Sequence, residues 1–204
     1  LMVGHRSGLA AAGIAGELAQ HSETVRSGLR VLIAHLHVHD RGGVLALQHE
    51  DARYCTLAYL IHHHDTVGST QIADAAMAIL MAIMRRLCGT EWVPTEVTLA
   101  RARPRDVSPY RRIFRAPIRF DAPRCALIFP ARDLERPIGN ADPLERARLL
   151  RLVEDLEAIR KDRGIDPLDR GGLILGQRAG ARLRRDLSGE LPGRHPRTLP
   201  CLSI

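Results

Sequence analysis

Hydrophobic residues recur at the spacing of an α-helix in two long stretches of the chain. Residues 24–39 carry an apolar residue at every third or fourth position, which predicts a helix with one buried face. A second helix is predicted from Ser69 or Thr70 to about Cys88, and its apolar residues cover most of the circumference. This second helix is therefore expected to be buried in the centre of the fold. A short third helix is predicted at 106–114.

Shorter apolar runs between these helices predict strands. Val44–His49 and Tyr54–His62 are separated by four polar or small residues and predict an antiparallel hairpin. Val97–Leu99 alternates as a strand does, and Ile118–Phe120 with Ala126–Phe129 predicts a second hairpin. Helices and strands in this mixed order, with short connections, favour an α+β domain. We expect helices packed on a small, mostly antiparallel sheet, followed by a helical linker region at the C-terminal side.

The most strongly marked helix follows residue 141. Asp142 is a suitable cap, Pro143 fits the first helical position, and Gly164 ends the pattern. Apolar residues then alternate at intervals of three and four, as in a coiled coil. This row, called the leucine seam below, consists of Leu149, Leu152, Leu156 and Ile159.

Two interpretations of the leucine seam are equally compatible with the sequence. The seam packs either on its own domain or against the same helix of a second copy of the chain, in which case all four residues form a dimer interface. A weaker helix is predicted at Leu173–Leu187, where Gly176 and Gly180 lower the helix propensity.

Composition limits the possible classes of protein. The chain has 204 residues, of which 45% are hydrophobic and 26% charged, values typical of one globular domain or of one domain and part of another. No apolar run approaches the roughly 20 residues of a membrane span. Four widely spaced cysteines are too few for a disulfide scaffold, which predicts a reduced, cytoplasmic chain without membrane contact.

The formal net charge of +7 comes from 30 basic and 23 acidic residues. Lys161 is the only lysine, so arginine supplies nearly all of the positive charge. Arginine binds phosphate through a planar, bidentate contact, so an anionic partner remains one alternative. A bias in the coding sequence would explain the excess of arginine over lysine equally well. Halves divided at Leu144 both carry an excess of basic residues, so the excess is interpreted as spread along the chain.

Motifs that would indicate an enzyme or a cofactor are missing from the sequence. His49-Glu50 begins like a zinc-protease motif, but Arg53 stands where the second histidine ligand must be. The sequence has neither a phosphate-binding loop ending in lysine nor the G-x-S-x-G motif of hydrolases. We therefore expect no enzymatic activity, no catalytic residue, no metal and no cofactor.

Two groups of histidines support a competing hypothesis. His35 and His39 are four residues apart near a predicted helix end, and His62 and His64 lie on one side of a predicted strand end. Together they would make a small metal-dependent enzyme. The simpler interpretation is that they are polar residues at the ends of elements, and a folded remnant that senses nothing is a third alternative.

The most specific pattern in the chain lies between residues 110 and 137. It reads Tyr-x3-Phe-x2-Pro-x2-Phe-x8-Phe-x4-Leu-x2-Pro, with Arg111–Phe114 and Pro123–Phe129 as further matching stretches. This pattern resembles the end of the ligand-sensing domain in a large branch of AraC-type bacterial transcription regulators, and the similarity covers about Gly8–Pro196. The residues of the pattern are Tyr110, Phe114, Pro117, Phe120, Phe129, Leu134 and Pro137. Large aromatic rings are expected to pack in the core and are assigned no chemistry.

The resemblance implies a sensor that binds a small-molecule effector and helps a regulator to form homodimers. In such proteins a C-terminal domain with two helix-turn-helix units binds promoter DNA. After Pro196 this chain instead reads Arg197–Ile204, which is too short for such a unit. We expect an N-terminally clipped effector-sensing domain at 1–141, a helical dimerisation and linker region at 142–196, and an aberrant tail at 197–204. Promoter DNA would be contacted only through a C-terminal domain that is missing here.

Overall fold

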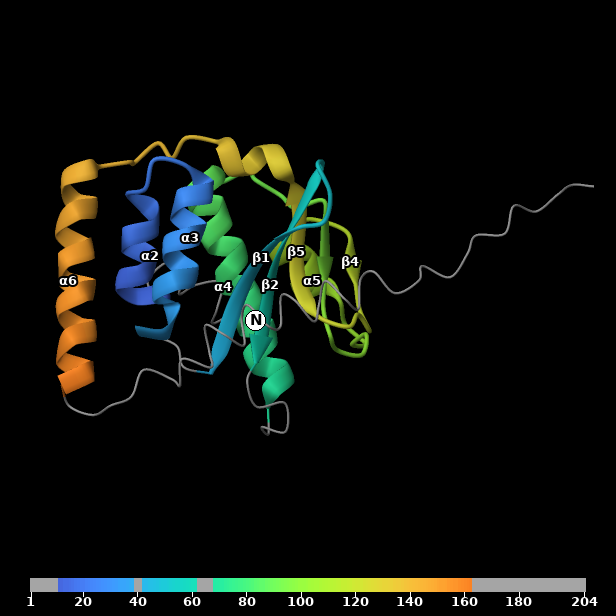
Figure 1. The fold of residues 1–204 in the computed structure, drawn as a ribbon. Coiled ribbons are helices and arrows are strands. Elements are labelled where there is room, and N and C mark those ends of the chain that lie inside the picture. Colours follow the sequence, from blue (N-terminus) through green and yellow to red (C-terminus); the bar gives the residue numbers. More distant parts are fainter. Residues whose placement is uncertain (1–10, 39–41, 62–67, 163–204) are drawn as a thin grey trace, which may run out of the picture.

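A computed structural model describes residues 11–38, 42–61 and 68–162 of the chain (Figure 1). The predicted segments 173–187 and 197–204 lie outside the described residues. The described helices are α2 (Gly13–Gln20), α3 (Val25–His35), α4 (Ser69–Cys88), α5 (Ser108–Phe114) and α6 (Pro143–Asp162), with 3-10 helices η2 (Leu36–Val38) and η3 (Ala131–Glu135). The described strands are β1 (Gly43–His49), β2 (Tyr54–Ile61), β3 (Glu96–Thr98), β4 (Ile118–Arg119) and β5 (Cys125–Pro130).

The strands form one sheet in the order β1-β2-β5-β3-β4. The first predicted hairpin is confirmed, since β1 and β2 are antiparallel with Gly43 opposite Ile61 and His49 opposite Cys55. Strand β5 pairs antiparallel with both β2 and β3, and β4 pairs parallel with β3. The predicted α+β architecture with a mostly antiparallel sheet is thus confirmed.

The second predicted hairpin is wrong, because β4 and β5 are not neighbours. Asp121 adopts a left-handed conformation with φ of 55°, and its N–H donates to the carbonyl of Arg101. The next N–H, of Ala122, donates to the carbonyl of Leu99. These two bonds fasten the turn after β4 to the end of β3. Strand β5 then enters the sheet on the other side of β3.

The hydrophobic core lies between the sheet and the helices. Helices α3 and α4 pack against the sheet, α2 packs on α3, and α6 lies outermost, beside α2 (Figure 1). The strands present alternate residues to the core, while α4 presents a row of methionines. The core members from these elements are Cys55, Leu57, Tyr59, Val97, Leu127 and Phe129 on the sheet, and Met77, Met81 and Met84 on α4. None of the described helices is long and apolar enough to cross a membrane.

The aromatic residues of the 110–137 pattern pack as predicted. Phe114 and Phe129 are fully buried and Tyr110 nearly so. The ring of Tyr110 meets that of Phe120 edge-on at 5.5 Å, and Trp92 meets Phe129 at 5.9 Å. Such edge-to-face contacts hold α5 against the segment that follows β4, and β5 against the loop that follows α4.

The end of the same pattern closes on the start of α3. The N–H of Val25 donates to the carbonyl of Arg136, and the N–H of Ile138 donates to that of Glu23. The side chain of Thr24 caps α3 by accepting from the N–H of Ser27. Residues far apart in sequence therefore hold the same helix end in place.

Gly28 marks a close approach between α2 and α3. A β-carbon at this position would lie 2.8 Å from the carbonyl oxygen of Ala19, a backbone atom that cannot move aside alone. Replacing Gly28 by alanine is expected to destabilise the fold by about 1–2 kcal/mol, because overpacking outweighs the gain in helix propensity. Urea unfolding followed by circular dichroism measures the change.

Gly139 provides the matched control for this substitution. A β-carbon there has no neighbour within 4 Å, so Gly139→Ala should leave stability nearly unchanged. Equal stability of the two variants would contradict the close approach of α2 and α3.

Candidate functional site

Helix α6 divides the predicted leucine seam between two environments. Asp142 caps the helix by accepting hydrogen bonds from the N–H groups of Leu144 and Glu145, as predicted. Leu149 is 1% exposed and packs with Val153 against Leu18 of α2. This member of the seam is therefore part of the intramolecular core.

The other three members of the seam face away from the domain. Leu152 is 42% exposed, Leu156 37% and Ile159 49%. Large apolar side chains exposed in a row on one helix are a common feature of surfaces that meet a partner. The intramolecular interpretation thus holds for Leu149, while the other three members of the seam are left exposed by their own domain.

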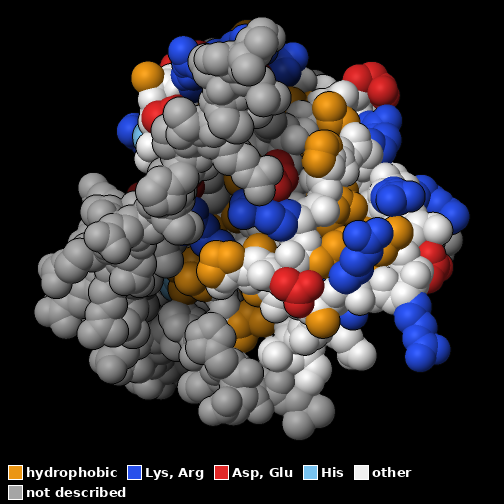
Figure 2. Space-filling model, turned by 90° about the vertical axis from the view of Figure 1, so that its right-hand side faces the viewer, with side chains coloured by type: hydrophobic (Ala, Val, Ile, Leu, Met, Phe, Trp, Pro, Cys, Tyr) orange, Lys and Arg blue, Asp and Glu red, His pale blue; other side chains and the backbone are white. Residues whose placement is uncertain are grey.

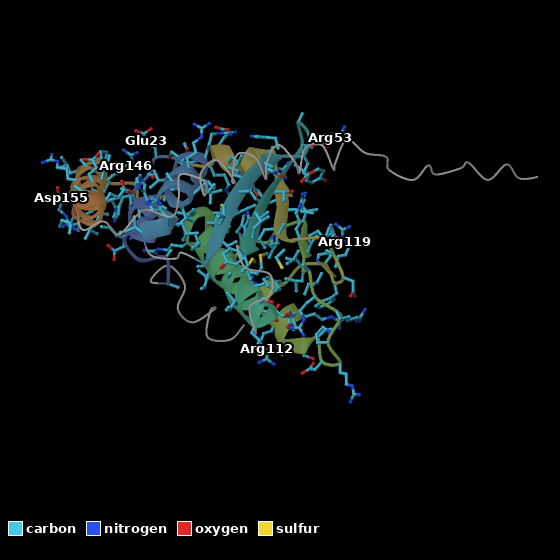
Figure 3. The ribbon with its side chains drawn as sticks, turned by 60° about the horizontal axis from the view of Figure 1, so that its bottom comes forward. Glu23, Arg53, Arg112, Arg119, Arg146 and Asp155 are labelled. Carbon is cyan, nitrogen blue, oxygen red and sulfur yellow. The ribbon has the colours of Figure 1, made fainter. Side chains whose placement is uncertain are left out.

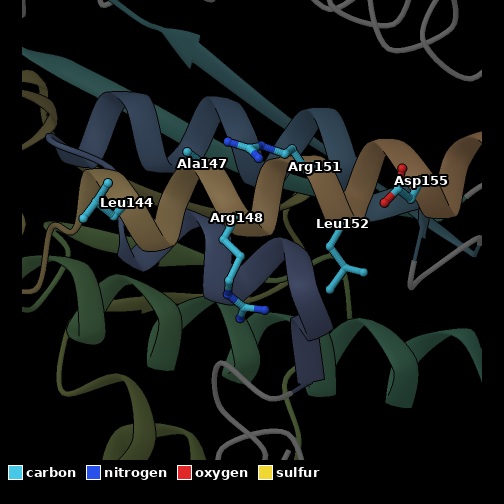
Figure 4. Close-up of a pocket in the computed structure, with 6 residues that line it drawn as sticks. All are labelled: Leu144, Ala147, Arg148, Arg151, Leu152 and Asp155. Atoms are coloured by element: carbon cyan, nitrogen blue, oxygen red, sulfur yellow. The ribbon is translucent and has the colours of Figure 1, made fainter.

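An open groove of about 350 Å³ runs along the outer side of α6. All six residues that line it come from this one helix, so no second element closes over it (Figure 4). A site that encloses a small molecule needs walls from several elements. The groove is thus a feature of the α6 surface and does not enclose a ligand. Its lining residues are Leu144, Ala147, Arg148, Arg151, Leu152 and Asp155.

The histidines of the competing metal hypothesis are only partly described. His35 lies at the end of α3, where its Nδ1 is 3.1 Å from Oε1 of Glu157 on α6. The Nε2 of His37 lies 3.5 Å from the same oxygen. His39, His62 and His64 lie outside the described residues. Over the described part of the chain, no group of three or more metal-binding side chains is brought together.

A buried polar cluster, the Asp74 cluster, joins α4 to α5. Oδ2 of Asp74 accepts hydrogen bonds from Tyr110 Oη at 2.6 Å and from Arg101 Nη1 at 2.5 Å. Asp74 is 5% exposed, and the guanidinium of Arg101 also lies over the ring of Tyr110, 5.6 Å from its centroid. Burial, followed by the hydrogen bond to Asp74, raises the pKa of Tyr110 to about 12. The phenol therefore remains a donor throughout the physiological pH range.

The Asp74 cluster was not predicted from the sequence. A signal was present, because Asp74 interrupts the apolar face of the most hydrophobic predicted helix. A buried carboxylate requires partners, and two of them come from segments that follow β3. In the described structure every buried polar side-chain atom has a hydrogen-bond partner. The Asp74 cluster is thus self-satisfied and holds α5 against α4.

The described cysteines are protected thiols. Cys55, Cys88 and Cys125 are all buried and unpaired with one another. Burial raises the pKa of each thiol, to about 12 in the case of Cys88. Their thiolate forms, which nucleophilic attack and metal binding require, are therefore disfavoured at physiological pH.

The chain is similar to known regulators in fold and in sequence family. Comparison with curated proteins found no match. Among solved structures, the transcriptional regulator CdpR from Pseudomonas aeruginosa has a similar fold, with a TM-score of 0.65 and 20% sequence identity. The similarity covers 94% of this chain and 59% of that one, so this chain spans little more than half the length of CdpR. Residues 1–138 match the family described as the N-terminal arabinose-binding domain of AraC transcription regulators. The chain belongs to this family of ligand-sensing regulator domains.

Proposed function

We propose that this chain is the effector-sensing and dimerisation part of an AraC-type regulator that controls a promoter in response to a small molecule. The observation that carries the proposal is the family match over residues 1–138, followed at once by a helix with an exposed apolar row. In this proposal residues 1–141 sense the effector and residues 142–196 serve dimerisation and connection. The protein acts in the cytoplasm, and its role is regulatory and not enzymatic.

The surface of α6 supports self-association as a homodimer. Leu152, Leu156 and Ile159 are exposed on one side, and charged side chains of both signs surround them. A symmetric pair of helices buries each apolar row against its copy and lets opposite charges meet along the rims. The proposed contact therefore uses three members of the seam, while Leu149 anchors the helix to its own domain.

The contacts of α6 with the sensing domain support communication between the two parts. Leu149 and Val153 rest on Leu18, while Glu157 lies beside His35 and His37. A movement of α2 or of the end of α3 would therefore shift α6. An effector that alters these elements would change how two copies meet. It would then bind monomer and dimer with different affinity and so shift the balance between them.

Effector binding is tested by a thermal-shift screen of the 204-residue chain against a library of small metabolites. A ligand at about 100 times its Kd stabilises the folded state by about 2.7 kcal/mol, which raises Tm by roughly 5–10 °C in a domain of this size. We expect such a shift from one chemical class of metabolite, and sedimentation should then show a change in the monomer–dimer equilibrium. Reading of a specific promoter sequence is assigned to another part of the regulator.

Two outcomes would contradict this function. The first is a screen in which no metabolite raises Tm. The second is sequence-specific promoter binding by the 204-residue chain alone, with effectors having no influence, which would place the DNA-reading part inside it.

A further inference from the structure

The positive charge of the protein is concentrated around α5. Residues 101–120 contain seven arginines and one acidic residue, Asp106, and so carry +6 of the total of +7. The net charge of the first half of the chain does not reveal this concentration, because acidic residues elsewhere in that half offset the arginines. The segment comprises the loop after β3, helix α5 and strand β4.

Three of the seven arginines are engaged in ion pairs. Arg101 contacts Asp74, Arg115 lies 3.3 Å from Glu91, and Arg119 lies 3.1 Å from Glu96. The other four are exposed and, within residues 11–38, 42–61 and 68–162, form no ion pair. Asp106, the acidic residue of the segment, accepts a hydrogen bond from the N–H of Ser108. We call the four the arginine surface: Arg103, Arg105, Arg111 and Arg112.

The arginine surface rests on a rigid support. Tyr110, Ile113 and Phe114 are the buried side of α5, so Arg111 and Arg112 stand on its outer side. Figure 3 shows Arg112 and Arg119 at the end of the molecule opposite Arg146 and Asp155 on α6. Viewed towards that end, basic side chains outnumber acidic ones on the described surface (Figure 2). The positive charge is thus presented at a fixed place, far from the proposed dimer contact.

We propose that the arginine surface binds the phosphate backbone of duplex DNA beside the site that the regulator reads. Guanidinium groups donate two parallel hydrogen bonds to a phosphate, and four of them release bound counterions from the duplex. Between the arginines lie Pro104, Asp106, Ser108, Pro109 and the partly buried Val107, while Tyr110 is buried. The surface therefore offers little apolar contact for a protein and no exposed ring for stacking single-stranded bases. Contacts to phosphate carry no sequence information, so this surface adds affinity without reading bases.

This inference rests on the proposed function, because a regulator operates close to DNA. Its failure is nevertheless distinguishable. If the arginine surface does not bind DNA, an effector should still raise Tm. If no effector is found, binding of DNA by the arginine surface can still be measured.

The test uses the 204-residue chain and a fluorescent duplex of about 30 bp with random sequence, titrated at several salt concentrations. One variant replaces all four residues of the arginine surface by glutamine. The matched control carries Arg30→Gln, Arg53→Gln, Arg86→Gln and Arg132→Gln, four exposed arginines outside α6 that likewise form no ion pair in the described part of the chain. Both variants lose four positive charges and keep residues 163–204. The effects of net charge and of that segment on DNA affinity are therefore the same in both.

The arginine-surface variant should lose at least about tenfold in affinity at low salt, and the slope of log K against log salt should flatten by up to about 3.6, or about 0.9 for each lost phosphate contact. The control should lose markedly less. Circular dichroism of both variants verifies the fold.

Three results would overturn the inference. They are undetectable DNA binding by the unmodified chain, equal losses in the two variants, and tighter binding to an acidic polypeptide such as polyglutamate than to the duplex at the same salt. A second variant with lysine at the four positions separates charge from geometry. It should keep most of the salt slope and lose part of the affinity, because lysine does not bind phosphate in a bidentate way.

Discussion

A chain that carries both Leu152→Arg and Leu156→Arg is expected to sediment as a monomer at concentrations where the unmodified protein is a dimer. Both side chains are partly exposed, so neither substitution removes a buried residue from the domain. In a symmetric dimer, however, the double variant places four guanidinium groups where apolar surface would be buried. The loss of burial and the like charges should weaken association by about 4 kcal/mol or more, roughly a thousandfold in Kd.

Two single variants on the same helix act as controls. Leu144 is 84% exposed and lies outside the leucine seam, so Leu144→Arg should leave the dimer intact. Leu149 is buried against α2, so Leu149→Arg should lower the free energy of unfolding by several kcal/mol. Persistence of dimers in the double variant, with native circular dichroism, would show that the exposed row has another role.

The second large effect is expected in the Asp74 cluster. Replacing Arg101 by methionine leaves the Asp74 carboxylate buried without its cationic partner. Breaking such a pair costs about 3–5 kcal/mol when both groups are fully buried. Because the Arg101 side chain is 26% exposed, we expect a loss near the lower end, about 3 kcal/mol. Urea unfolding of the variant and of the unmodified chain measures the difference.

Controls for the Arg101 variant come from the chain itself. Arg119→Met breaks an exposed ion pair with Glu96 and should cost less than about 1 kcal/mol. Adding Asp74→Asn to Arg101→Met removes the unpaired charge and should restore part of the lost stability. A loss for Arg101→Met no larger than that for Arg119→Met would show that Asp74 does not depend on this partner.

The sequence predicted those elements whose signals are local. Val44–His49 and Tyr54–His62 are short apolar runs joined by a short polar turn, so their pairing needs no other part of the chain. Helix α4 begins at Ser69 and ends at Cys88 as predicted, because Gly89 with φ of 105° stops it. The packing of Tyr110, Phe114 and Phe129 followed from their size.

The missed features depend on residues that are distant in sequence. Helix α2 contains two glycines and two alanines among its eight residues, a composition with weak periodicity, and α3 and α6 pack on it. Strand β4 has two residues, too few to show that its partner is β3 and not β5. The division of the leucine seam depends on the position of Leu18, which no spacing within α6 reveals.

The close approach of α2 and α3 at Gly28 determines how motion can reach α6. A β-carbon at Gly28 would lie 2.8 Å from a backbone oxygen of α2, so the two helices are closely packed. We expect them to turn as one body, and α6 to turn with α2, on which it packs. The 20 residues of α6 measure about 30 Å at 1.5 Å per residue. A rotation of about 5° then displaces one end of the helix against the other by roughly 2–3 Å. In the proposed regulator, α6 would carry a small rotation of α2 to its far end, and the close packing at Gly28 would limit independent movement of α3.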